Sequence, residues 1–205
     1  MREITFKIEE KQDGLMIRDF LRNFGVSSAL LTKLKQDENG ISLNGEFAKA
    51  IAVLHTSDVL KIRIKNKGKM PEKFICDKVK VAYDDEDILV LSKPPLMPVH
   101  ESRNHRGDTL ANVAACYMES DCAFRAVYRL DRDTSGLVLI AKNELAASKL
   151  AGKIKKDYYA IVKGKFEGEG TIDLPIRRVR ESIIERGVFD DGERAITHYL
   201  SLIHI

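Results

Sequence analysis

The hydrophobic residues in the N-terminal part of the chain recur first at helical spacing. A first helix is predicted from apolar positions at near-helical intervals, which are Leu15, Ile17, Phe20, Leu21 and Phe24. Gly25 is typical of a helix end. Ser27 or Ser28 can cap a second helix, which would turn Leu30, Leu31 and Leu34 inward. The pattern therefore predicts two short amphipathic helices in succession.

After these helices the period changes to that of strands. Residues 41–43 form a short apolar segment, and Asn44-Gly45 is a strong signal for a tight hairpin turn. Residues 59–64 alternate apolar residues with mostly basic ones, which indicates a strand that is buried on one face and basic on the other. Two helices followed by a small sheet are thus expected within residues 1–66.

The second part of the chain contains more predicted strands than helices. Strands are expected at residues 79–81, 88–91, 137–141, 158–164 and 195–200, and helices at 109–117 and from Asn143 through 154. Pro94, Pro95 and Pro98 interrupt the chain after the second of these strands, because proline removes ladder donors. Strands and helices do not alternate regularly, so the fold class is predicted as α+β with a mixed, mainly antiparallel sheet and flanking helices.

Composition narrows the class of protein further. The 205 residues are 44% hydrophobic and 32% charged, with a net charge of +3. No apolar run approaches the roughly 20 residues that span a bilayer, so no membrane association is expected. The first residues resemble neither a signal nor a transit peptide, and a cytoplasmic location follows by default. The three cysteines have no metal-ligand spacing and are expected to be reduced thiols.

Positive charge is concentrated in one stretch. Residues 61–80 carry the basic side chains Lys61, Arg63, Lys65, Lys67, Lys69, Lys73, Lys78 and Lys80 against Glu72 and Asp77. Such a cluster can neutralise phosphates, but like charges are also typical of a solvated linker. Both interpretations stay open, and residues 67–77 are predicted as a basic linker between residues 1–66 and residues 78–205.

The most informative segment reads RLDRDTSGL and begins at Arg129. It places a polar loop directly before an apolar strand that we expect to be buried on both faces, and catalytic groups are often held in such loops. A cation such as Arg129 close to Asp131 favours an ionised carboxylate. An ionised carboxylate at a fixed position can act as a nucleophile or as a base.

Three other interpretations of this loop compete with catalysis by Asp131. A calcium loop fails because its last ligand position is occupied by Lys142 instead of glutamate. A hydrolase nucleophile at Ser135 lacks the G-x-S-x-G context. A simple turn, in which aspartates cap neighbouring backbone amides, stays open on the residues alone. No cluster of His, Asp and Glu has metal-ligand spacing, so no metal site is predicted.

RLDRDTSGL resembles the central motif R-L-D-x-x-T-S-G of RluA-type RNA pseudouridine synthases. ILVLSKPPLMPVH is similar to the strand and proline loop of that family, usually K-P-x-G, and KDYYAIVKG is similar to its K-x-Y-x-A strand. The segments FGVSSALLTKLK, ISLNG and SDVLKIRI resemble the small RNA-binding domain of the ribosomal protein S4 type. Together these resemblances cover nearly the whole chain.

The resemblance implies an isomerase that converts uridine into pseudouridine in structured RNA without a cofactor. Asp131 would be the catalytic aspartate, Arg129 would help to hold the flipped nucleotide, and Tyr158 would stack on the uracil, with Tyr159 as the competing candidate. Residues expected at the RNA are Lys33 and Lys35, by the resemblance, and Arg103, Arg106 and Arg132, by sequence proximity to the loop. Ribosomal RNA is favoured over transfer RNA as the substrate, and a monomer is expected.

Three departures from the family's pattern are visible. Tyr128 replaces a histidine before the RLD triplet, and Leu96 replaces a glycine, where a positive φ would strain leucine. The chain ends just inside a segment similar to the family's A-x-T-x-Y strand. We therefore expect a C-terminally truncated catalytic domain in which Asp131 lacks its basic partner. The alternative function is a non-catalytic RNA-binding module with a vestigial synthase domain.

Overall fold

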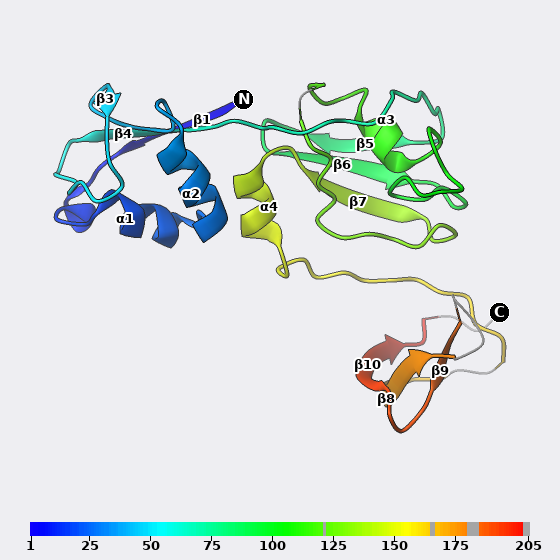
Figure 1. Cartoon of the computed structure of the whole chain (residues 1–205). Helices are drawn as coiled ribbons and strands as arrows, with labels where there is room; N and C mark the ends of the chain where they lie inside the picture. Colours follow the sequence, from blue (N-terminus) through cyan, green and yellow to red (C-terminus); the bar gives the residue numbers. More distant parts are fainter. Residues whose placement is uncertain (121, 165–166, 180–184, 203–205) are drawn as a thin grey trace. The chain divides into compact units, whose positions relative to one another are not determined.

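A computed structural model describes residues 1–120, 122–164, 167–179 and 185–202 (Figure 1). The chain divides into two compact units, residues 1–155 and residues 156–205, which are considered separately. The predicted domain boundaries near residues 66 and 78 both lie inside the first unit, and they stay predictions. The described part is a mixture of antiparallel sheets and few helices, which agrees with the predicted α+β class.

The first sheet of this unit is antiparallel and has the order β1-β4-β2-β3. Its strands are β1 (Arg2–Lys7), β2 (Ile41–Leu43), β3 (Glu46–Phe47) and β4 (Val59–Ile64). A short 3-10 helix, η1 (Glu10–Gln12), follows β1, and the helices α1 (Ile17–Phe24) and α2 (Ser28–Gln36) come before β2. Leu21 of α1, Leu30 of α2 and Ile62 of β4 are buried in one hydrophobic core, so the helices cover one face of the sheet.

Local signals set the ends of these elements as predicted. The Ser27 hydroxyl accepts a hydrogen bond from the backbone N–H of Leu30 at 3.2 Å and caps α2. Gly25 ends α1 with φ +106°, a left-handed conformation that glycine adopts without a steric penalty. Asn44 and Gly45 both have positive φ, 53° and 91°, as the tight turn between β2 and β3 requires.

The second sheet has the order β5-β6-β7 and is also antiparallel. It consists of β5 (Lys80–Asp84), β6 (Ile88–Lys93) and β7 (Gly136–Ala141), and the helix α3 (Leu110–Ala114) contributes to its core. The expectation that residues 137–141 are buried on both faces is wrong, since Leu137 is 54% exposed while Val138 and Ile140 are buried. Only one side of this strand faces the core, because alternate residues of a strand point to opposite faces.

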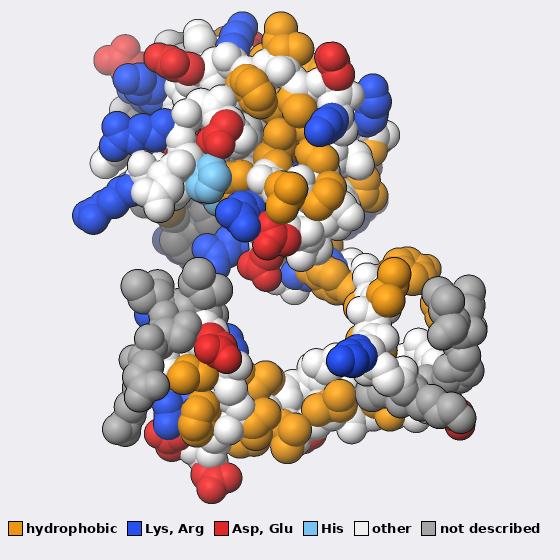
Figure 2. All heavy atoms as spheres, turned by 90° about the vertical axis from the view of Figure 1, so that its right-hand side faces the viewer, with side chains coloured by type: hydrophobic (Ala, Val, Ile, Leu, Met, Phe, Trp, Pro, Cys, Tyr) orange, Lys and Arg blue, Asp and Glu red, His pale blue; other side chains and the backbone are white. Residues whose placement is uncertain are grey.

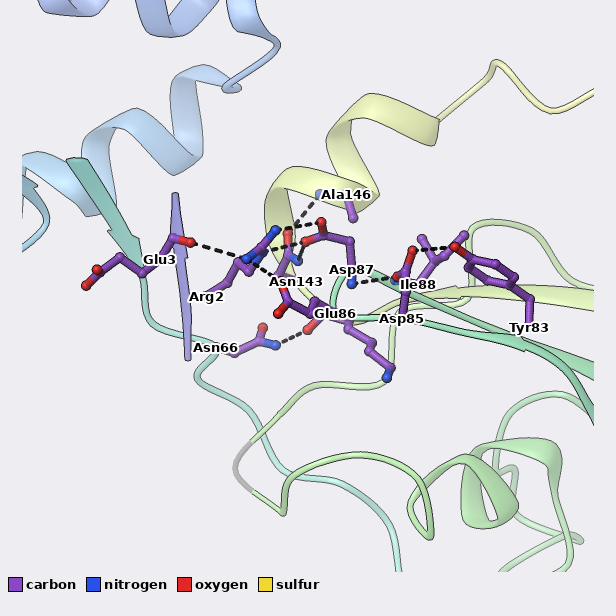
Figure 3. Close-up of polar contacts among 11 residues, drawn as sticks. Arg2, Glu3, Asn66, Tyr83, Asp85, Glu86, Asp87, Ile88, Asn143 and Ala146 are labelled. Carbon is purple, nitrogen blue, oxygen red and sulfur yellow. Dashed lines mark hydrogen bonds and ion pairs between the residues drawn. The ribbon is translucent and has the colours of Figure 1, made fainter. Parts of the chain in front are cut away.

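The helix α4 (Glu144–Leu150) and β1 join the two sheets of the first unit (Figure 3). The guanidinium of Arg2 donates to both carboxylate oxygens of Asp87, at 2.9 and 3.1 Å, and Asn143 donates to the same carboxylate at 2.7 Å. Leu145 of α4 is 4% exposed and belongs to the core of the first sheet. Hydrophobic packing and a shared carboxylate therefore hold the two halves of this unit together.

The predicted basic linker, residues 67–77, is part of the first unit. Most of its side chains are exposed, but its backbone is held at several positions, beginning at the preceding Asn66. Asn66 is 8% exposed, and its side-chain amide donates to the backbone oxygen of Lys142. A Cβ on Gly68 would lie 2.5 Å from the Cβ of Ala123, so the backbone passes this residue too closely for any side chain. The backbone N–H of Phe74 donates to the backbone oxygen of Asn112 at 3.1 Å.

The second unit contains the antiparallel sheet β10-β8-β9. Its strands are β8 (Glu169–Arg178), β9 (Arg186–Val188) and β10 (Glu193–Leu200), of which only β10 was predicted. The predicted strand at residues 158–164 is wrong, because the segment has no regular structure and Ile161 is 96% exposed. A sequence with strand propensity forms a strand only when another strand pairs with it. Hydrophobic side chains lie along the outside of this unit (Figure 2).

Candidate active site

The RLD loop is anchored by its central leucine. Before the loop, residues 125–127 pair with β7, through hydrogen bonds from the N–H of Val127 to the oxygen of Leu139 and from the N–H of Ala141 to the oxygen of Arg125, both 2.8 Å. Leu130 is 8% exposed and packs in the core beside β7, whereas its neighbours Arg129 and Asp131 are exposed. The buried leucine thus fixes the loop and leaves the two charged side chains at the surface.

Asp131 is available for chemistry in this arrangement. Among the described residues, none donates a hydrogen bond to its carboxylate or forms an ion pair with it; only its backbone oxygen is used, by the N–H of Thr134 at 3.2 Å. The capping turn that competed with catalysis is therefore not formed by this carboxylate. The neighbouring Asp133 does have a partner: the guanidinium of Arg132, at 2.8 Å, holds the pKa of Asp133 below its usual value.

Lys93 connects the proline loop to the RLD loop from the inside. The side chain is 1% exposed, and its ammonium donates to the backbone oxygens of Pro94 at 3.0 Å, Met97 at 2.8 Å and Arg132 at 2.9 Å. Burial lowers the pKa of Lys93, while the negative charges of Asp133 and Asp131 raise it. All three protons of the ammonium are used, so this lysine fixes the backbone next to Asp131.

Sequence reasoning missed Lys93 as a site residue, although a signal was present. Leu89, Leu91 and Lys93 occupy alternate positions of β6, and all three are buried. A lysine at an inward position of a strand has to satisfy its protons internally, because an unpaired buried charge is strongly unfavourable. Its position immediately before the proline loop indicates where those partners lie.

The proline loop also brings His100 to the site. The His100 ring packs edge to face on Phe124, with 5.2 Å between ring centroids. Desolvation lowers the pKa of His100, and the positive charge of Arg129 lowers it further. Arg129 is therefore within electrostatic reach of a histidine whose neutral form is favoured.

The two departures at this site have structural counterparts. Leu96 has φ +66° and is 71% exposed, so the expectation that this position strains a leucine is confirmed. The Tyr128 hydroxyl donates to the backbone oxygen of Leu137 at 3.0 Å. This residue thereby joins the beginning of the RLD segment to β7.

The structure brings together only some of the predicted site residues. Arg129, Asp131 and Arg132 lie on one loop, and Arg103 and Arg106 lie exposed on the long loop after the proline segment. Tyr158 and Tyr159 are 60% and 87% exposed and belong to the second unit, which is described separately.

The two lysines predicted at RNA both lie on α2. The Lys33 ammonium lies 2.6 Å from the carboxylate of Glu144. Lys35 is exposed.

Other site types find little support within the described residues. There, no group of His, Cys, Asp and Glu is arranged to hold a metal ion. In the same ranges, no helix combines the length and apolar character needed to cross a membrane. One hollow lies on the first sheet and another runs between residues 74–81 and α3, and Asp131 lines neither.

Comparison with known proteins identifies relatives of this chain. A family model described as RNA pseudouridylate synthase matches residues 87–204. The chain is 34% identical to the RNA pseudouridine synthase YjbO of Bacillus subtilis over 196 residues. This aligned region covers 90% of this chain and 69% of that protein. It is 40% identical over 130 residues to the ribosomal large subunit pseudouridine synthase D of Pseudomonas aeruginosa, covering 59% of this chain and 40% of the relative.

A comparison of structures also finds a match. Human RNA Pseudouridylate Synthase Domain Containing 4 matches with a TM-score of 0.39 and 15% identity, over 58% of this chain and 52% of that chain.

Proposed function

Because the chain belongs to the RNA pseudouridylate synthase family, we propose that Asp131 is the carboxylate with which it isomerises uridine in RNA. The observation that carries this proposal is the state of the Asp131 side chain. It is exposed at the surface of a loop that the buried side chains of Leu130 and Lys93 hold in place. No described residue forms a hydrogen bond or an ion pair with its carboxylate. A carboxylate held in this way is a suitable nucleophile.

The reaction makes specific demands on the site. The bond between the ribose and N1 of uracil breaks, the base rotates, and C5 joins the ribose, while the proton on C5 is lost and N1 gains one. Asp131 attacks the nucleoside as the bond to N1 breaks, and the carboxylate is released when C5 of the rotated base joins the ribose. A uridine within structured RNA has to leave its stack first, which costs a few kcal/mol. Contacts between basic side chains and phosphates offset this cost.

Arg129 and Tyr158 complete the proposed catalytic set. Arg129 is exposed two residues before Asp131 and holds the flipped nucleotide. Tyr158 stacks on the uracil and assists removal of the C5 proton, as the K-x-Y-x-A resemblance implies. Arg103, Arg106 and Arg132 contact the RNA backbone near this loop.

The N-terminal half of the first unit is proposed as an RNA-binding domain of the ribosomal protein S4 type. Its two helices, α1 and α2, cover one face of a small sheet, and Lys33 and Lys35 of α2 lie at the surface. The name of the Pseudomonas aeruginosa relative indicates large-subunit ribosomal RNA, which we propose as the substrate class for this chain. A monomer acting in the cytoplasm completes the proposal.

Tritium release from RNA labelled at C5 of uridine tests this function. Ribosomal RNA from cells that lack the gene is the substrate, because its target uridine is unmodified. Release that depends on the protein supports the proposal, and mapping of the new pseudouridine identifies the position. Salt-sensitive binding of the same RNA without any release would favour the alternative, a non-catalytic binding module.

A further inference from the structure

A hollow lies on the face of the first sheet that the helices do not cover. Its volume is about 630 Å³, within the range of ligand sites. Its lining residues are Glu38, Asn39, Ser42, Asn44, Gly45, Phe47, Val59, Lys61 and Arg63. On β4, Leu60 and Ile62 face the core, so Lys61 and Arg63 point to the opposite side. The resemblance assigns α2 and the turn after it to RNA. The hollow includes Glu38 and Asn39 of that turn, while Lys61 and Arg63 of β4 lie outside the helix.

An exposed aromatic ring stands at this hollow. Phe47 of β3 is 57% exposed and is paired across the hairpin with Ser42 of β2. The short strand β3 is the last in its sheet, so one side of it has no neighbouring strand among the residues that the structure describes. An exposed ring next to positive charge is the feature on which proteins stack unpaired bases.

Polar side chains beside the ring are free to bind a base. Within the described ranges, no residue forms a hydrogen bond with the side chains of Asn39 and Ser42. An asparagine amide offers both a donor and an acceptor, as the edge of a base requires. Asn44, by contrast, is used within the fold, since its side chain binds the carboxylate of Asp58 and the N–H of Val59, both at 2.8 Å.

The two basic residues of the hollow, Lys61 and Arg63, form solvent-exposed ion pairs with one carboxylate. Glu3 of β1 lies 2.9 Å from Lys61 and 3.0 Å from Arg63. All three side chains are between 34% and 41% exposed, and ion pairs exposed to solvent contribute little stability. A phosphate can therefore replace Glu3 as the partner of these two residues at a small cost in free energy. Among the lining residues of the hollow itself, Glu38 carries the one carboxylate.

The positive charge continues beyond the hollow. After Lys61 and Arg63, every second residue is again an exposed lysine, at Lys65, Lys67 and Lys69. We call these five residues the basic stripe. Lys61 and Arg63 lie on β4, where alternate residues are about 7 Å apart. Lys65, Lys67 and Lys69 follow the end of this strand, and Lys65 forms an ion pair with Asp37 at 2.7 Å. From β4 the chain crosses to the half of the first unit that contains β5–β7 (Figure 1).

We propose that this hollow binds an unpaired nucleotide of the RNA substrate. The base stacks on Phe47 and bonds to Asn39 or Ser42, while the flanking phosphates bind Lys61, Arg63 and the rest of the basic stripe. The basic stripe would guide the single-stranded RNA from the hollow towards the half of the first unit that carries Asp131. This inference rests on the proposed function in taking RNA as the ligand, and it adds a single-strand site beside the helical surface.

The chain contains no tryptophan, so an indole placed at Phe47 reports on stacking without background. Phe47→Trp should bind single-stranded oligouridylate with a loss of indole emission, because a stacked base quenches it. Ile51→Trp is the matched control, since Ile51 is 63% exposed in the same half but does not line the hollow. Phe47→Ala should weaken binding of the oligonucleotide about tenfold and leave binding of an RNA duplex unchanged.

Two outcomes would overturn the inference. One is an indole at Phe47 that is quenched no more than the indole at Ile51. The other is Phe47→Ala binding the single strand as tightly as the unchanged protein. Tritium release measured on the same preparations separates this inference from the proposed function. Release without quenching rejects the hollow alone, and quenching without release on any RNA rejects the catalytic role while the hollow stands.

Discussion

The ammonium of Lys93 and the backbone oxygen of Arg132 are joined by a hydrogen bond of 2.9 Å across 39 residues of sequence. Through this contact, the end of β6 fixes the loop that carries Asp131. The same ammonium binds two carbonyls of the proline loop. One buried side chain therefore sets the relative position of the two loops at the proposed active site, and the position of a catalytic carboxylate strongly affects the rate.

Replacing Lys93 with methionine should slow the reaction and destabilise the fold. Methionine fills a similar volume but leaves three carbonyls without a donor, and unsatisfied buried groups cost about 2 kcal/mol in the free energy of unfolding. We expect kcat for pseudouridine formation to fall at least about tenfold, with KM almost unchanged. Lys80→Met, at an exposed position of β5, is the control. An unaltered kcat in Lys93→Met would show that this lysine does not position the loop.

Replacing Leu96 with glycine should stabilise the protein. Leu96 adopts φ +66° with its side chain 71% exposed, so little burial is lost on removal. The left-handed conformation costs a leucine about 1–2 kcal/mol, and the greater freedom of glycine in the unfolded chain offsets part of the gain. Urea denaturation should show an increase of about 0.5–1 kcal/mol in the free energy of unfolding. A decrease would mean that the leucine side chain makes a stabilising contact.

Replacing Leu145 with alanine should weaken the packing between the two halves of the first unit. Leu145 lies on α4, yet it is buried in the core of the first sheet at 4% exposure. We expect a loss of about 3 kcal/mol in the free energy of unfolding, as for other buried leucines. Thermal unfolding should then broaden or split, because the packing that couples the halves is reduced. Leu137→Ala, at a position 54% exposed, should change stability by less than about 1 kcal/mol.

Features set by neighbouring residues were predicted well from the sequence. Gly25, Ser27 and the Asn44-Gly45 pair act on the backbone next to them, so their effect is the same in any fold. The cap of α4 by Asn143 belongs to this class, since its side chain accepts from the N–H of Ala146 at 2.9 Å. Such interactions need no knowledge of distant parts of the chain.

Features set by distant partners were missed or predicted wrongly. The strand β1 forms because it pairs with β4, about sixty residues later, and no local pattern reveals that partner. Residues 158–164 have strand propensity but pair with no strand in the described chain. Leu137 looks like a core residue in sequence, but it lies on the side of β7 that does not face the core.

The candidate site shows the same division. The RLD motif led us to propose Asp131 and Arg129, because both candidates stand within one short run of consecutive residues. Lys93 escaped because its role depends on carbonyls of Met97 and Arg132, which come together only in the folded loop.

The role of Asp131 is tested most directly by tritium release from uridine-labelled ribosomal RNA in a matched pair of variants. Asp131→Asn removes the nucleophile with almost no change in shape and should abolish release while RNA binding persists. Asp133→Asn changes the same charge two residues away, where the carboxylate already pairs with Arg132 at the surface, and should retain most of the activity. Substantial release by Asp131→Asn, or equal loss in both variants, would contradict the assignment of Asp131 as the catalytic carboxylate.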